Sequence, residues 1–210
     1  MPDWTKSMQQ SYEYYTVDPT TLADVQRLDN VKSASFSRDA EVETLGSATV
    51  DATQVFGESY VRGYLKTIQN GETEKHALGT VLVQTPSSSF NGMYTEVSMD
   101  AYTPLIELKE KRPPLGYTVR KDSDIMDTAY RIIRENARAP VTYIKPSLDE
   151  ETMKLQKDFV ANADDTWLTF VIDLIKNAKF ELGLDEMGHI LFVPIRELDS
   201  MQPIWTYDDG

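Results

Sequence analysis

The sequence predicts an α+β fold in which strands predominate. Residues 1–110 hold about six short segments in which apolar and polar residues alternate, and turn-forming residues separate them. Residues 115–197 instead show two segments of helical periodicity, and the second leads into two short alternating segments. We therefore expect a β-barrel or sandwich over 1–110, followed by a small α/β domain with a helix and a β-hairpin over 115–197.

The helix of this second domain is expected to begin near Asp164. Asp164 or Asp165 can cap its first turn, because a carboxylate accepts the free main-chain N–H groups there. One apolar stripe runs along the segment at helical spacing. It is formed by Trp167, Leu168, Val171, Ile172, Leu174, Ile175 and Ala178.

The hairpin follows at once, since the period changes to two in residues 180–184 and again in 190–192. Residues 185–188 (DEMG) between them fit a tight turn in which Gly188 is free to take a positive φ. A helix that packs on this hairpin would bury Trp167, Phe180 and Phe192 in one core.

Upstream, Asp124 can cap a second helix that continues to about Arg138 and is stopped by Pro140. Residues 141–144 and 159–161 read as short strands, and 146–157 as an exposed insertion or a short helix over 150–156.

In the first half the expected strands are 11–17, 25–38, 48–53, 60–68, 78–84 and 94–102. Asn70 and Gly71 form a favoured turn pair, but the distance to His76 predicts a polar tip longer than two residues. Residues 85–89 (TPSSS) are expected to be a loop and 104–108 a short helical turn. The charged, proline-containing segment 109–114 is the expected domain junction.

Composition excludes several kinds of site. The 210 residues contain no cysteine and two histidines, so disulfides, thiolate nucleophiles and Cys- or His-rich metal sites are excluded. A net charge of -13 opposes binding to phosphate backbones and anionic lipid. The longest apolar runs are too short to span a bilayer, and residues 1–10 lack the apolar segment of a signal peptide. We expect a soluble protein made in a cytoplasm.

No pattern of catalytic residues is found, and we expect no catalytic, cofactor or metal residues; a carboxylate site for calcium or magnesium is the kind of metal site that the composition leaves open. The acidic groups at 149–151 and 164–165 read as solvated charges or helix caps rather than a glycosidase pair. Residues 185–188 lack the ligand spacing of a calcium loop, and the serines at 87–89 have no histidine nearby in the sequence. His189 is expected to be a solvent-facing hairpin residue.

Three neighbouring tyrosines, Tyr12, Tyr14 and Tyr15, could stack on sugars or bases. In a strand such residues more often pack in a core or at a subunit interface, which is the interpretation that we prefer.

Two stretches resemble bacteriophage tail and baseplate hub proteins, a group that includes the late-control proteins. The runs 78–86 (LGTVLVQTP) and 99–109 (MDAYTPLIELK) are similar to the first, tail-tube-like barrel of these hubs. The stretches 164–168, 180–182 and 188–192 are similar to their helix-and-hairpin module. The resemblance spans residues 3–207 and implies a tail-tube-like β-barrel followed by a mixed α/β domain.

The resemblance implies a structural, non-enzymatic role in the virion. A hub adaptor joins the tail tube to the spike or tip and forms part of the conduit for DNA or effectors. Its implied partners are tube or distal tail proteins, a spike or tip protein and its own copies, as a homotrimer when full length. Specific nucleic-acid binding, membrane insertion and cofactors are not expected.

Two alternative functions remain open at the level of the sequence. The chain could be the docking region of a tail-associated cell-wall hydrolase, or a host-glycan binding module that uses Tyr12 or Tyr14. Because family hubs carry a second barrel, residues 198–210, with Trp205 and Tyr207, are expected to begin a further segment.

Overall fold

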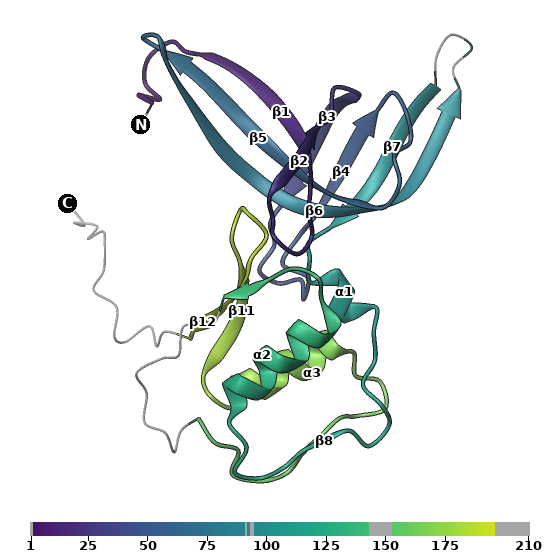
Figure 1. The fold of residues 1–210 in the computed structure, drawn as a ribbon, viewed down its shortest axis with the longest axis vertical. Helices are drawn as coiled ribbons and strands as arrows, with labels where there is room; N and C mark the ends of the chain where they lie inside the picture. The colour runs from purple at the N-terminus through teal and green to yellow at the C-terminus, as the bar shows by residue number, and fades with distance from the viewer. Residues whose placement is uncertain (1, 91, 93–94, 143–152, 196–210) are drawn as a thin grey trace, which may run out of the picture.

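Alternating apolar residues produce a large sheet in the first half of the chain, and helical periodicity produces a smaller body in the second. A computed structural model describes residues 2–90, 92, 95–142 and 153–195. Figure 1 shows the sheet as a strongly curved cup, with the helices and one hairpin beneath it. The α+β class with predominant strands is confirmed.

The sheet has seven antiparallel strands in the spatial order β2-β1-β5-β6-β7-β4-β3. Their bounds are β1 (Gln9–Val17), β2 (Asp24–Arg27), β3 (Val31–Ser37), β4 (Ser47–Ala52), β5 (Ser59–Gln69), β6 (Glu72–Phe90) and β7 (Thr95–Tyr102). The smaller body contains α1 (Ile106–Lys109), β8 (Thr118–Val119), α2 (Ile125–Asn136), β9 (Val141–Thr142), β10 (Phe159–Val160), α3 (Trp167–Lys176), β11 (Phe180–Leu184) and β12 (Ile190–Pro194).

The sheet is open, so the prediction of a closed tail-tube-like barrel over 1–110 was wrong. The expected single strand 25–38 is divided into β2 and β3, which lie at opposite edges of the sheet. The three residues 28–30 between them carry the chain from one edge to the other. Curvature brings the two edges toward each other, but hydrogen bonding does not join β2 to β3.

The strands in the middle of the sheet are longer than expected. The predicted polar tip after Asn70 is a tight turn, and the predicted loop 85–89 is part of a strand. Asn70 and Gly71 both have positive φ (53° and 82°), and Gln69 pairs with Glu72, so the tip is a two-residue turn. Residues 85–89 belong to β6, which bends where its register with β7 shifts between Val83 and Pro86. A bulge tolerates the missing N–H of proline.

The helices follow the predicted pattern with one different cap. Asp124 caps α2 by accepting a hydrogen bond from the main-chain N of Asp127 at 2.9 Å. Thr166, rather than Asp164 or Asp165, caps α3 through a capping box with Thr169. The hairpin of β11 and β12 is confirmed, and β9 extends it as a parallel third strand.

A continuous core joins the sheet to the smaller body. Val17, Tyr60 and Leu82 from the sheet are buried in the same cluster as the apolar faces of α1, α2, α3 and the hairpin. Trp167 and Phe180 belong to this core, and Phe192 packs against it. A second cluster fills the sheet itself around Val50, Met99 and their neighbours. The two parts are therefore held together by apolar burial as well as by the chain.

The expected short helix over 150–156 is not present in its described part. Residues 153–156 are not helical: Lys154 forms an isolated bridge with Asp124, and Met153 and Leu155 are buried in the core. The expectations for 149–151 and for 198–210, with Trp205 and Tyr207, lie outside the described residues. None of the described helices is long and apolar enough to cross a membrane.

Candidate functional site

The hairpin turn between β11 and β12 reaches the underside of the sheet (Figure 1). There Arg62 of β5 is almost completely buried, at 1% exposure. Its Nε donates to Oγ1 of Thr80 at 2.8 Å, and its Nη2 donates to the main-chain carbonyl of Met187 at 2.7 Å. The Thr80 hydroxyl in turn donates to the carbonyl of Glu186 at 3.1 Å. Two strands of the sheet thus hold two main-chain carbonyls of the turn.

On its other side Arg62 reaches the edge of the sheet. Its Nη1 donates to Oδ1 of Asp24 at 2.8 Å and to the hydroxyl of Tyr64 at 3.3 Å. Tyr64 donates to Oδ2 of Asp24 at 2.8 Å, and burial, the largest cause, raises the pKa of Tyr64 above its ordinary value. A buried guanidinium is costly unless charge and hydrogen bonds compensate it, and Asp24 supplies the charge.

The turn is shaped to fit this position. Gly188 has a φ of +94°, and a Cβ placed on it would lie 3.0 Å from Cβ of Thr80. Oδ1 of Asp185 accepts from the main-chain N of His189 at 2.8 Å, and Oδ2 lies 2.7 Å from Nδ1 of the same residue. His189, expected to face solvent, is therefore half-buried and bound to Asp185, where it stabilises the turn.

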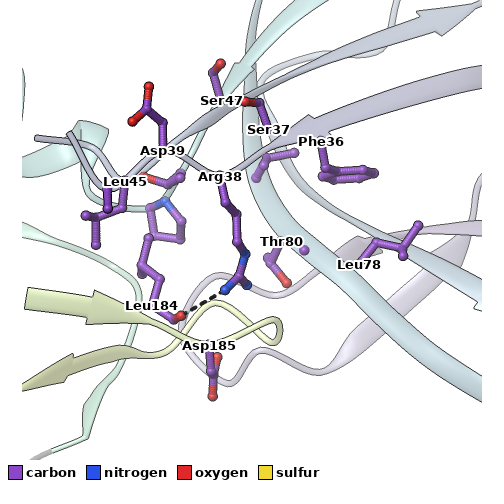
Figure 2. A pocket seen from close by; sticks show the side chains of 15 residues that line it. Phe36, Ser37, Arg38, Asp39, Leu45, Ser47, Leu78, Thr80, Leu184 and Asp185 are labelled. Atoms are coloured by element: carbon purple, nitrogen blue, oxygen red, sulfur yellow. Dashed lines mark hydrogen bonds between the residues drawn. The ribbon is translucent and has the colours of Figure 1, made fainter. Parts of the chain in front are cut away.

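A cavity of about 320 Å³ lies beside the docked turn (Figure 2). Its walls are mainly apolar, with Phe36, Leu45, Leu78, Pro104 and Leu184 among the lining residues. The side chain of Arg38 extends from the sheet to the hairpin, where Nη1 donates to the carbonyl of Leu184 at 3.4 Å. Hydroxyl groups also line the cavity, but no histidine is among its described lining residues. The arrangement offers shape and apolar surface rather than an activated nucleophile.

A second polar link joins the sheet to the helices. Glu107 of α1 is buried and accepts from the main-chain N and the Nε of Arg138 at 2.6 and 2.5 Å. Arg138 also donates to Glu58 at 3.0 Å and lies over the ring of Tyr60. Burial, with Glu107 nearby, raises the pKa of Tyr60 well above its ordinary value.

The three tyrosines predicted as a possible stacking surface have different surroundings, and Tyr12 and Tyr14 line one cavity beside β1 and β3. Tyr14 is buried, as the core interpretation expects, while Tyr12 is exposed. The ring of Tyr15 packs edge-on against Tyr64, and Nζ of Lys75 lies 3.9 Å from the centroids of both rings. Tyr14 and Tyr15 point to opposite faces of β1, as neighbours in a strand must.

The other residues singled out from the sequence lie apart from one another. Asp165 accepts from the main-chain N of Asn162, and His76 packs beside Trp4 at the far end of the sheet. Within the described ranges, no three His, Asp or Glu residues gather closely enough to hold a metal ion. Sequence reasoning missed Arg62, although an arginine inside the apolar segment 59–65 (SYVRGYL) is an unusual signal for a buried, paired charge.

The sheet edges are the other candidate surfaces. β2 covers β1 only from Tyr15 to Val17, so among the described residues no strand pairs with the outer side of Gln9–Glu13. The outer side of β3 likewise has no strand partner in the described structure. Such edges present main-chain donors and acceptors that can pair with another strand.

Comparison with known proteins places this fold. No protein-family model matches the chain, and no curated protein sequence matches it. Among solved structures, the tail protein from Neisseria meningitidis MC58 aligns with a TM-score of 0.60 at 8% identity, over 87% of this chain and 51% of that one. The 43 kDa tail protein of prophage MuSo2 from Shewanella oneidensis aligns with a TM-score of 0.57 at 10% identity, over 89% and 56%.

A chain of the Francisella PdpA-VgrG complex is also similar, with a TM-score of 0.50 at 10% identity over 97% of this chain and 31% of that one. This chain spans about half the length of the two tail proteins. The predicted resemblance to phage tail proteins is confirmed at the level of the fold, which this protein shares with them.

Proposed function

We propose that this protein is a structural component of a phage tail baseplate or tip. In this role it acts as a hub adaptor that joins the tail tube to the spike or tip. The observation that carries the proposal is a sheet whose two edges lack a strand partner in the described structure and which shares a core with the helix-and-hairpin body. The edges can accept further strands, and the shared core around Tyr60 and Leu82 holds the sheet in one orientation.

The two edges differ, which favours a ring over an isolated pair. One edge is formed by β1 and β2 and the other by β3. Pairing of β3 of one copy with β1 of the next is head-to-tail, and such contacts close into a ring when the rotation fits. We therefore keep the homotrimer as the proposed assembly of the full-length protein, in the virion tail, with tube and spike or tip proteins as its neighbours.

The net charge of -13 supports a role in a conduit. Carboxylates repel the phosphate backbone, so DNA can pass such a surface without binding. A neutral or basic inner surface in the assembled ring would contradict this part of the proposal.

The first test is the mass of the assembled full-length protein by light scattering, with a low-resolution image of the particle. We expect a ring of a few copies. A second arm introduces lysine at the free edge as Ser35→Lys in β3, because lysine on an edge opposes strand addition.

The matched control is Thr49→Lys in β4. Thr49 is the cross-strand partner of Ser35 and is also exposed, but it lies one strand inside the sheet. Ser35→Lys should dissociate the ring while Thr49→Lys leaves it assembled. A monomer at all concentrations, or equal behaviour of the two variants, would refute the proposal. Clearing of cell walls by the chain alone would instead favour a hydrolase.

A further inference from the structure

The edge strand β2 is attached to the sheet with almost no apolar burial. All four of its residues are exposed, and the one large apolar side chain, Val25, is 68% exposed. Its ladder with β1 is three residue pairs long and loses register between Thr16 and Val17. Since burial of apolar surface is the main force that holds strands in place, β2 needs another attachment.

That attachment is the carboxylate of Asp24, the first residue of β2. It accepts hydrogen bonds from Arg62 and from Tyr64, both at 2.8 Å, and Arg62 is almost completely buried. A second charged side chain of β2, Arg27, forms an ion pair with Glu13 of β1 at 3.7 Å, but Arg27 is 54% exposed. Exposed pairs of this kind contribute little.

The same guanidinium holds the hairpin turn. Nη2 of Arg62 donates to the carbonyl of Met187, and Thr80, which accepts from Nε of Arg62, donates to the carbonyl of Glu186. If the turn left the sheet, water would reach Arg62 and its attraction to Asp24 would fall with the higher local dielectric. If Asp24 left, the buried charge of Arg62 would lose its counter-ion and the docked turn would become less stable.

We propose that docking of the turn 185–188 and retention of β2 on the edge of β1 are coupled through Arg62. The hairpin thereby controls how much of β1 is open to another strand. With β2 in place, Gln9–Glu13 is the free part of the edge; with β2 released, the whole of β1 is free. The coupling stands on the contacts of Arg62 alone, whereas its role in assembly rests on the proposed function.

The test uses hydrogen exchange of the full chain carrying Gly188→Ala. Alanine at a φ of +94°, with its Cβ 3.0 Å from Cβ of Thr80, should force the turn off the sheet. Exchange should then accelerate at the amides of Gln26 and Leu28, which bond to Oγ1 of Thr16 and to the carbonyl of Tyr14. We expect about fivefold or more, the lower end of usual coupling between two sites.

The matched control is Gly71→Ala. Gly71 has a similar φ of +82°, but open space surrounds its Cβ position. Gly71→Ala therefore introduces the same kind of backbone strain without altering the docked turn 185–188. Its exchange at Gln26 and Leu28 should equal that of the unaltered protein. Faster exchange at the turn of Gly188→Ala with unchanged exchange at Gln26 and Leu28 would overturn the coupling.

The reciprocal variant is Asp24→Asn, because coupling between two sites must act in both directions. It should accelerate exchange at the amides of Gly188 and His189, while amides of the β5–β6 ladder stay protected and show that the fold is intact. If Gly188→Ala unfolds the chain, this arm decides: unchanged exchange at the turn overturns the proposal. Hydrogen exchange in each variant is measured on the monomer. The result therefore tests the coupling alone, while light scattering tests ring assembly independently.

Discussion

The ring of Phe36 lies directly against Gly63: a Cβ on Gly63 would stand 2.7 Å from two atoms of that ring. Phe36 belongs to the edge strand β3, whereas Gly63 lies near the other edge, on β5. The contact shows how far the sheet curls back on itself. It also explains a glycine in the interior of a strand, where it is usually unfavourable.

Substitution Gly63→Ala should therefore destabilise the protein. Overpacking at a rigid site typically costs about 1–3 kcal/mol, because the aromatic ring has to move. Urea unfolding measures the change. Gly57→Ala, where no atom lies within 4 Å of the Cβ position, is the control and should leave the midpoint unchanged.

The same experiment has a rescue arm. Phe36→Leu in the Gly63→Ala background removes the ring that the new methyl group meets, so part of the lost stability should return. An unchanged midpoint for Gly63→Ala alone would show that the sheet is less tightly curled.

Replacement of Trp167 by alanine should cost about 3–5 kcal/mol, as for other large core residues. Trp167 is buried at the start of α3, and its ring packs edge-on against Tyr117, with centroids 4.9 Å apart. Thermal or chemical unfolding gives the value. Leu115→Ala, at a side chain that is 91% exposed, should change stability by no more than about 0.5 kcal/mol. Equal stability of the two variants would remove Trp167 from the core.

Acid should weaken the turn that follows β1 in a defined pH window. The hydroxyl of Thr20, with the main-chain N–H groups of Thr20 and Thr21, holds the pKa of Asp18 at about 2, below its ordinary value of 3.8. Because the folded pKa is the lower one, the stabilisation is present above pH 3.8 and is lost as the pH falls through about 2.

A carboxyl-detected NMR titration of Asp18 tests this pKa directly. In Thr20→Val the pKa of Asp18 should rise toward 3.8, since the first of its hydrogen-bond donors is gone. An Asp18 that titrates near 3.8 in the unaltered protein would contradict the hydrogen-bond geometry.

Much of the local structure could be predicted from residue periodicity. The Asp124 cap, α2, α3 and the β11–β12 hairpin with its turn at Gly188 all depend on residues within a few positions of one another. The errors arose where distant contacts override local signals. Residues 85–89 look like a loop, yet β7 pairs with them and makes them strand.

By itself, the sequence determined the α+β class, the position of the helices and hairpin, and an acidic chain without cysteine. Only the tertiary structure decided that β2 and β3 lie at opposite edges, that the sheet stays open, and that Arg62 is a buried link. The physical reason is that these features depend on contacts between residues far apart in the sequence. Alternation of apolar and polar residues indicates which face of a strand is buried, but not which strand lies beside it. Arg62 meets Met187 across 125 positions of sequence, and only the folded chain brings such groups together.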